Sequence, residues 1–246
     1  MRTVANGGWY RENASVVFGR LLVIAGCAAL VAAACGDTST QYIENEDLGV
    51  FAKLPSEWAV YDTKELLTSM NQEEGQMSES ALDRAETQLW FRGFDASSQP
   101  SAEGSIKLGA SEPRGFVQIQ ALTQEERDQI NVSGLRGMVI GTDPLAAADS
   151  TMGALGGVAQ EDVQVITDEP ATFEGGYHGN HNVFAVKQGN DLAIVDQTAL
   201  LDSTSSRLYL FVVSCNETCY FESNSDDIKE LVESWTIDDS TAKNAS

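Results

Sequence analysis

The two histidines of the chain, His178 and His181, lie three residues apart in a glycine-rich segment and are the first candidates for chemistry. Neutral imidazole binds zinc and copper. Further ligands would have to come from neighbouring carboxylates: Asp168, Glu169 or Glu174. Side chains at i and i+3 point the same way only on a helix, and the three glycines of residues 175–181 indicate a loop. We expect this loop, with Tyr177, to carry incidental histidines, to contact a partner, or to bind a metal whose identity stays unknown.

Motifs of the common enzyme classes are missing from the sequence. It has no Gly-x-Ser-x-Gly nucleophile elbow, no His-Glu-x-x-His helix and no glycine loop that could cradle phosphate. A carboxylate pair for acid–base chemistry is recognised only in three dimensions, so the sequence leaves that possibility open. We therefore predict no catalytic residues and no cofactor.

Cys215 and Cys219 lie four residues apart in the segment Cys-Asn-Glu-Thr-Cys. Outside the cytoplasm, such a pair is expected to be oxidised. A metal site would need further ligands, and the sequence has no second cysteine pair. A redox centre usually has Cys-x-x-Cys spacing. We predict a structural disulfide, with a metal pair, a redox pair and free thiols as the alternatives.

The amino-terminal segment predicts where the protein resides. Arg2, Arg11 and Arg20 are followed by a continuous apolar stretch, residues 21–34, which ends in small residues directly before Cys35. This order is typical of a secretory signal, and the stretch is shorter than the about 20 apolar residues that a spanning helix needs. The segment resembles a bacterial lipoprotein leader. That resemblance implies cleavage before the cysteine, a diacylglycerol thioether on its sulfur, and acylation of the new amino terminus, for example with palmitate.

Cys35 is the predicted lipidation site. Cleavage at the alternative, Cys27, would leave the apolar residues 28–34 on the mature protein. An ordinary cleaved signal with an incidental cysteine is a further alternative, and translation from Val16 or Val17 would shorten the long section before residue 21. Because two or three acyl chains hold a protein stably to a bilayer, we expect membrane lipid as a partner and a location on the outer, extracytoplasmic face of the cell membrane.

The chain is strongly acidic, with 37 Asp and Glu against 15 Lys and Arg. Removal of residues 1–34 would leave 36 acidic and 12 basic side chains. Such a surface repels nucleic acid and anionic headgroups, so no nucleic-acid partner is expected. The acidity is spread along the chain, which favours a general solubility adaptation over a specific site. No Asp-x-Asp-x-Asp-Gly calcium loop is present.

Several strands are expected in the first half of the mature chain. Residues 49–61 predict two short strands around a turn, in which Pro55 presets φ. Residues 87–94 and 115–122 predict further strands. Between them, residues 96–111 are rich in Ser, Gly and Pro and predict a loop.

Two helices are predicted before residue 160. Thr123 and Glu126 have the spacing of a capping box, so a helix should begin there and run toward Met138. An Asp-Pro pair at residues 143–144 predicts the start of another helix, which the glycine pair at 156–157 would end.

The last third of the chain predicts an antiparallel meander. Residues 182–188 and 191–201 are joined by a tight turn at 189–190, and the chain returns along residues 207–215. Residues 208–213 are apolar on both alternating faces, so this strand should lie in the middle of a sheet that is covered on both sides.

A final helix should follow the meander. Ser225 is expected to cap it. Its apolar residues recur at i, i+3, i+4 and i+7, which predicts one buried stripe: Ile228, Leu231, Val232 and Trp235. Together, these elements predict an α+β fold, an antiparallel β-sheet flanked by helices.

Motifs at the two ends of the folded part resemble the PsbP-like superfamily. They are a first hairpin, Phe51-x-x-Leu54-Pro55-x-x-Trp58, and a helix end, Glu233-Ser234-Trp235-Thr236-Ile237. That superfamily includes a photosystem II extrinsic subunit, a Ran-binding nuclear import factor and actinobacterial lipoproteins of the LpqN kind. The resemblance implies an α/β/α sandwich around an antiparallel sheet. It also implies a role in binding other proteins, with no shared catalytic residues to carry over.

We therefore expect four parts in the chain: a lipoprotein signal peptide (1–34), a lipidated amino terminus with a flexible tether (35–47), a single globular domain (48–240) and a tail (241–246). The expected function is that of a non-enzymatic binding or accessory module in the cell envelope. Its sheet edge or its histidine segment would contact an envelope protein or a small ligand. The alternative is a metal-dependent hydrolase or metal-binding protein that uses His178 and His181.

Overall fold

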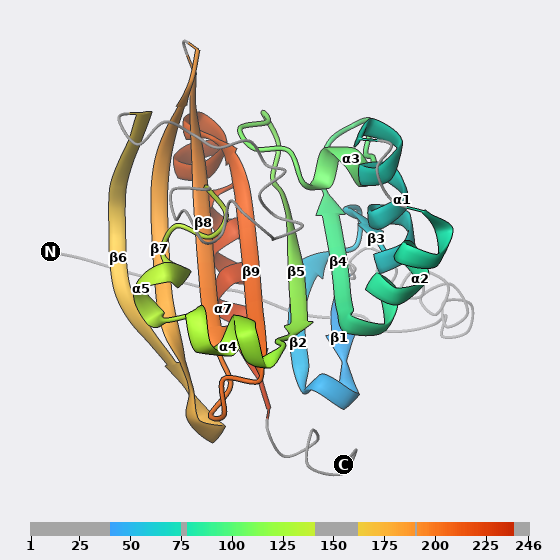
Figure 1. Cartoon of the computed structure of the whole chain (residues 1–246). Coiled ribbons are helices and arrows are strands. Elements are labelled where there is room, and N and C mark those ends of the chain that lie inside the picture. Colours follow the sequence, from blue (N-terminus) through green and yellow to red (C-terminus); the bar gives the residue numbers. More distant parts are fainter. Residues whose placement is uncertain (1–39, 75–77, 141–161, 190, 239–246) are drawn as a thin grey trace, which may run out of the picture. The chain divides into compact units, whose positions relative to one another are not determined.

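The computed structural model describes residues 40–74, 78–140, 162–189 and 191–238, which form two antiparallel sheets and several helices (Figure 1). The larger sheet has the strand order β3-β4-β5-β9-β8-β7-β6. Its strands are β3 (Ala59–Tyr61), β4 (Leu89–Asp95), β5 (Arg114–Ala121), β6 (Val163–Phe173), β7 (Tyr177–Gln188), β8 (Asp191–Leu201) and β9 (Arg207–Asn216). The smaller sheet has the order β1-β2-β10 and consists of β1 (Thr40–Asn45), β2 (Val50–Pro55) and β10 (Thr236–Ile237).

The described α-helices are α1 (Thr63–Glu74), α2 (Glu79–Gln88), α3 (Ala102–Ser105), α4 (Gln124–Gln129), α5 (Val132–Leu135) and α7 (Ser225–Ser234). Two single 3₁₀ turns, η1 (Glu46–Leu48) and η4 (Glu174–Gly176), and one π-helix, η5 (Cys219–Ser223), complete the list. The helix predicted over residues 143–157 lies outside the described residues.

Strand β9 forms the centre of the larger sheet, between β5 and β8. Leu210 and Val212 face one hydrophobic core, while Tyr209 and Phe211 face the other. All four side chains are buried, because successive residues of a strand point to opposite faces and both faces are covered. The prediction of a central strand from its doubly apolar pattern is confirmed, and so is the β7-β8-β9 meander.

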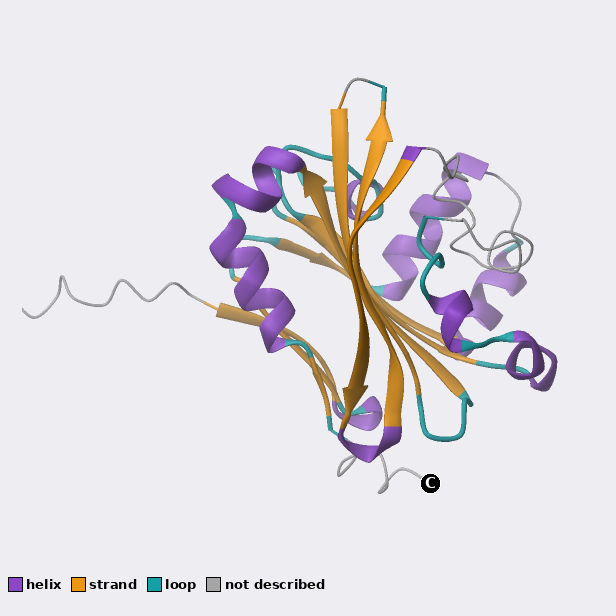
Figure 2. Cartoon of the chain, turned by 90° about the vertical axis from the view of Figure 1, so that its left-hand side faces the viewer, coloured by secondary structure: helices purple, strands orange, loops and turns teal. Residues whose placement is uncertain are grey.

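Helices cover both faces of the larger sheet (Figure 2). On one face, α7 and the smaller sheet pack through a core that includes Leu231 and Trp235. On the other face, α1, α2 and α5 pack through a core that includes Leu66 and Leu135. Burial of apolar surface at about 25 cal/mol per Å² is the main force that holds such layers together. The predicted α+β fold, an antiparallel sheet flanked by helices, is confirmed.

Residues 40–47 are folded, although the sequence predicted them as part of the tether. Strand β1 pairs with β2 over its full length, and the side chain of Asn45 caps η1 by accepting a hydrogen bond from Leu48 N at 3.1 Å. Within β1 only Ile43 is buried, so the segment lacks the alternating pattern that signals a strand. The described fold therefore begins at Thr40, five residues after Cys35.

The two strands predicted in residues 49–61 are present, but they do not form a hairpin. Strand β2 pairs with β1 and β10, whereas β3 pairs with β4 in the larger sheet. A tight turn between them is closed by Trp58 N, which donates to Pro55 O at 3.3 Å. Trp58 then stacks on Phe94 of β4, with 5.8 Å between ring centroids. The turn carries the chain from one sheet to the other because this tryptophan is buried between them.

The helix predicted from Thr123 to Met138 is interrupted. The capping box forms as expected, since Thr123 Oγ1 accepts from Glu126 N and Glu126 accepts from Thr123 N. Helix α4 ends at Gln129 because Ile130 adopts an extended conformation, φ −73° and ψ 138°. Asn131 then caps the separate short helix α5. Sequence periodicity continues across such a break and does not reveal it.

Smaller differences concern the ends of elements. The loop predicted over residues 96–111 contains the short helix α3, and the strand predicted from residue 87 begins at Leu89, where α2 ends. Helix α7 starts after Asn224, and Ser225 does not cap it: its hydroxyl donates to Glu222 O at 3.3 Å. The buried stripe of α7 is confirmed, with Ile228 and Leu231 fully covered.

Candidate functional site

The two histidines lie on one strand and face opposite sides of the sheet. The turn η4 ends at Gly176, and β7 begins at Tyr177, so both imidazoles project from a strand and not from the predicted loop. Positions i and i+3 of a strand point to opposite faces. His178 Nδ1 lies 3.1 Å from Gly176 O, whereas His181 Nε2 lies 2.8 Å from Asp196 Oδ1. The two rings therefore do not share a metal ion in this arrangement.

Asp196 is the centre of a polar network on the face that carries η5. Its carboxylate is 3% exposed, and it accepts from Tyr220 of η5 through the phenol hydroxyl at 2.6 Å while its other oxygen contacts His181. A buried carboxylate is costly unless each oxygen is paired, and these two partners pair both. The network ties β7 and β8 to the segment that leads into α7.

Hydrogen bonding and burial set the protonation of this network. The hydrogen bond to Asp196 raises the pKa of His181, against a smaller lowering by burial. Burial, and then the charge of Asp196, raises the pKa of Tyr220 far above the range where phenols ionise in water. Tyr220 is therefore a permanent donor, and His181 is the member of the network whose raised pKa favours the charged, imidazolium form.

A carboxylate–imidazole pair is half of a general-base arrangement, which also needs a nucleophile and a cavity for the substrate. None of the three network residues lines either of the two pockets described below. In the described residues, no group of three His, Cys, Asp or Glu side chains is placed to hold a metal ion.

A His181→Gln variant should lose stability mainly at acidic pH. The folded pKa of His181 lies above its unfolded value of about 6.5, so pairing of the imidazolium with Asp196 stabilises the fold fully below about pH 6.5. This contribution disappears as the pH rises through the folded pKa. Urea unfolding at a series of pH values should give a difference from the unmodified protein that shrinks toward alkaline pH. His178→Gln is the matched control, because its ring contacts a backbone carbonyl. A difference for His181→Gln that grew with pH would refute the ion pair.

Cys215 and Cys219 form the predicted disulfide, at the end of β9 and the start of η5. Both sulfurs belong to buried residues, and Cys219 N is held by Asn216 Oδ1 at 2.8 Å. The bond closes the corner through which the chain leaves the central strand. Tyr220, the partner of Asp196, follows immediately, so the disulfide also positions one end of the polar network.

Reduction of the disulfide should lower the free energy of unfolding by about 2 kcal/mol, the chain-entropy value for so short a loop. Equilibrium unfolding with and without reductant measures the change. The double variant Cys215→Ala/Cys219→Ala is the control and should not respond to reductant. If the unmodified protein were equally stable with and without reductant, the bond would contribute nothing to the fold.

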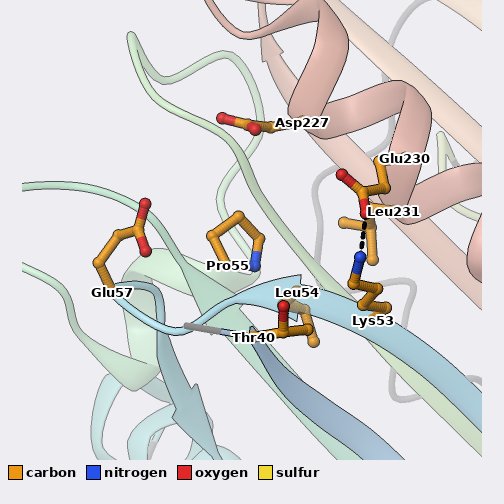
Figure 3. Close-up of a pocket in the computed structure, with 8 residues that line it drawn as sticks. All are labelled: Thr40, Lys53, Leu54, Pro55, Glu57, Asp227, Glu230 and Leu231. Carbon is orange, nitrogen blue, oxygen red and sulfur yellow. Dashed lines mark hydrogen bonds and ion pairs between the residues drawn. The ribbon is translucent and has the colours of Figure 1, made fainter. Parts of the chain in front are cut away.

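One pocket lies between β2 and α7 and is mainly acidic (Figure 3). Glu57, Asp227 and Glu230 border it, and the single lysine at its rim, Lys53, pairs with Glu230. Burial raises the pKa of Asp227, and repulsion from Glu57 and Glu230 raises it further. The pocket can attract a cationic group, but its carboxylates do not converge as the ligands of a metal ion do.

A second pocket lies beside β6 on the face that α5 covers, with a volume of about 300 Å³. Its walls are mostly apolar and come from the residues that follow α5, from β6 and from β7: Arg136, Gly137, Ile140, Val163, Val165, Asp168, Asn182 and Phe184. A largely apolar cavity with a few polar groups is the usual form of a binding site.

Buried polar side chains of the sheet hold the segment that carries Arg136. Gln197 of β8 is 0% exposed, donates to Leu135 O at 2.7 Å and accepts from Val139 N at 3.2 Å. These two bonds fix the backbone on both sides of Arg136 against the sheet. A buried glutamine whose amide is used at both ends specifies one arrangement, because any other would leave a polar group unpaired.

The polar groups of this second pocket form a compact cluster. Arg136 Nε lies 2.9 Å from Asp168 Oδ1, and Asn182 Nδ2 donates to the same oxygen at 2.9 Å. Asp168 was considered from the sequence as a metal ligand, and the structure instead pairs it with an arginine. Glu169 and Glu174 are exposed, in β6 and in η4 respectively.

Strand β6 is the outer edge of the larger sheet and pairs only with β7 among the described residues. It is eleven residues long, far longer than β3 at the opposite edge. Val165 and Ile166 are 56% and 44% exposed, and they lie at a bulge in the pairing with β7. The sequence did not predict this strand.

The site residues that sequence reasoning missed are Asp196, Tyr220 and Arg136. The sequence contained a signal for Asp196, because this carboxylate directly follows the apolar run Ala193-Ile194-Val195 of a buried strand. A buried charge is costly unless it is paired, so a partner for Asp196 could have been expected. No local signal marks Tyr220 or Arg136, because their partners are 24 and 32 residues away in the chain.

These observations define the class: an α+β domain with a disulfide at the end of its central strand, a long edge strand that pairs on one side only within the described ranges, and a cavity beside that edge. No protein-family model and no curated protein matches the chain. Among solved structures, it is similar to the solution structure of cyanobacterial PsbP (CyanoP) from Synechocystis sp. PCC 6803, with a TM-score of 0.43 and 15% identity over 83% of this chain and 96% of that one. A likeness at this level assigns no activity, partner or location.

Proposed function

We propose that the protein is a non-enzymatic binding module that is held at the extracytoplasmic face of the cell membrane by lipid on Cys35. The observation that carries this proposal is the leader, in which arginines precede a short apolar stretch that ends in small residues directly before the cysteine. The lipid class would be a diacylglycerol thioether together with an amide-linked acyl chain such as palmitate.

The disulfide supports a location outside the cytoplasm. Disulfides form and persist in oxidising compartments and are rare where glutathione and thioredoxin keep thiols reduced. Cys215 and Cys219 are placed for that bond within the folded domain. Lipidation of Cys35 would leave no other cysteine in the mature chain, so no competing pairing arises.

The start of β1 at Thr40 supports a short tether between the lipid on Cys35 and the folded domain. The five residue steps from Cys35 to Thr40 reach at most about 18 Å when fully extended. The domain would therefore work within a short distance of the bilayer surface. No helix among the described residues is long and apolar enough to cross a membrane.

The open edge of β6 and the adjacent cavity support binding as the activity. An unpaired strand edge presents backbone donors and acceptors in a row, and the cavity offers space for a side chain or small ligand next to it.

Fractionation and protease accessibility together test the proposal. In cells that express the protein, it should partition into the detergent phase of a membrane extract and be digested by protease added to spheroplasts. A cytoplasmic protein of the same cells is the control and should survive the protease. Recovery in the aqueous phase, or survival inside intact spheroplasts, would overturn the assignment.

A further inference from the structure

The edge of the larger sheet at β6 differs from the opposite edge of the same sheet. At the opposite edge, β3 is three residues long, and its side chains are half-buried. Strand β6 continues for eleven residues, and two adjacent large apolar side chains, Val165 and Ile166, face solvent there. Apolar exposure confined to one stretch of a sheet edge is typical of an interaction surface.

The apolar cavity opens directly beside this edge. Val163, Val165 and Asp168 of β6 form one wall, and Ile140 and Phe184 contribute to the others. A strand added alongside β6 would place alternate side chains on the same face of the sheet, toward the cavity. Main-chain hydrogen bonds with pockets for alternate side chains are the mode by which many proteins bind extended peptides.

The charge of the edge defines the chemistry of its partner. Residues 162–173 contain three carboxylates, Asp162, Asp168 and Glu169, and no lysine or arginine. Arg136 neutralises Asp168, while Glu169 is exposed. An extended segment with basic side chains complements this edge, and an acidic one is repelled.

The same features disfavour pairing between two copies of this chain. Two β6 strands side by side would bring their carboxylates together, and like charges opposite each other destabilise a sheet. Pro170 lacks an N–H, and the bulge between Val165 and Thr167 interrupts a flat edge. Among the described residues, no other strand pairs with the outer side of residues 162–169.

We propose that residues 162–169, which are Asp162 and the first part of β6, bind an extended, basic segment of a partner protein as an additional strand, with an apolar side chain of that segment in the cavity next to Val165. The inference rests on the proposed function, since it specifies the surface and the partner chemistry of the binding module. It does not depend on the lipid anchor.

Synthetic peptides test this proposal on the full-length protein in detergent micelles. The probe is a capped nonapeptide of alternating lysine and valine residues, in about 150 mM salt to screen non-specific attraction. Binding is measured by titration calorimetry, and its location by hydrogen exchange of the protein amides. We expect slowed exchange in residues 162–169. The same peptide methylated on alternate backbone nitrogens should bind at least about tenfold more weakly, because it loses hydrogen bonds to the β6 backbone.

Variants supply the matched comparison. Val165→Lys should weaken binding by about tenfold or more, since it adds a positive charge beside the cavity and removes an apolar contact. Tyr42→Lys changes an exposed aromatic residue on an edge strand of the smaller sheet and should bind like the unmodified protein. If Val165→Lys does not fold, the methylated peptide on the unmodified protein still decides the question.

Four results would overturn the inference: equal binding of the methylated peptide, equal binding of a glutamate–valine peptide, slowed exchange elsewhere than β6, or no binding up to about 1 mM peptide. Protection of β6 that rises with protein concentration alone would assign the edge to a second copy and would also overturn it. Because the experiment uses extracted protein, its failure would leave the membrane anchor standing.

Discussion

Replacing Cys35 with serine should abolish lipid labelling of the protein and leave residues 1–34 attached. Lipoprotein processing needs a sulfur to carry the diacylglycerol, and cleavage follows that modification, so a serine at this position stops both steps. Each CH₂ of an acyl chain that is buried in the bilayer contributes about 0.8 kcal/mol to membrane attachment. The serine variant would carry no acyl chain and would lose this contribution. Metabolic labelling with an alkyne analogue of palmitate, read together with gel mobility, measures both effects.

Cys27→Ser is the matched control, because it removes the other cysteine of the leader and keeps the predicted cleavage site intact. It should be labelled and shortened like the unmodified protein. The reverse pattern, with Cys27→Ser unlabelled and Cys35→Ser labelled, would place the anchor at Cys27. Labelling of both variants would mean that the acyl chain is attached elsewhere.

A Phe211→Ala variant should lose about 3–5 kcal/mol of unfolding free energy, the cost of truncating a fully buried phenylalanine. Phe211 lies on the central strand β9, is 0% exposed, and stacks on Trp235 with 5.1 Å between ring centroids. Its ring joins the sheet to the layer that α7 and the smaller sheet form. The free energy of unfolding of natural domains is only about 5–15 kcal/mol, so this substitution would remove a large part of the stability of the domain.

Urea unfolding followed by circular dichroism provides the measurement. Phe221→Ala is the control, since Phe221 of η5 is 49% exposed and its truncation should change stability by no more than about 0.5 kcal/mol. Equal losses for the two variants would show that the central strand is not the core of the domain.

The elements that the sequence predicted well are those whose patterns are local and strong. Strand β9 shows apolar residues on both faces, the turn after Gln188 is short, and Thr123 with Glu126 satisfies a motif that is complete within four residues. The stripe of α7 recurs at helical spacing. In each case, the residues that determine the element lie close together in the chain, so the local sequence was sufficient to predict it.

The elements that the sequence missed take their structure from distant partners. Strand β1 buries only Ile43, and β6 exposes Val165 and Ile166 at an edge, so neither shows the alternation of a half-buried strand. The break after Gln129 is invisible in the periodicity because only two residues separate it from the next helix. Edges and breaks are positions where tertiary context outweighs local preference.

The candidate site was predictable in part for the same reason. The disulfide followed from two cysteines four residues apart, a local feature. The partners of His181 and Asp168 are set by strand register and by the path of the chain after α5, and neither can be read from spacing. The sequence therefore identified His181 as notable and could not show that Asp196 holds it.

Intact-mass spectrometry of the protein extracted from cell membranes tests the central claim most directly. The predicted result is the mass of residues 35–246 with one disulfide, a diacylglycerol thioether on the amino-terminal cysteine and an amide-linked acyl chain. A chain that starts elsewhere, or residues 35–246 with Cys35 unmodified, would contradict a lipid-anchored binding module.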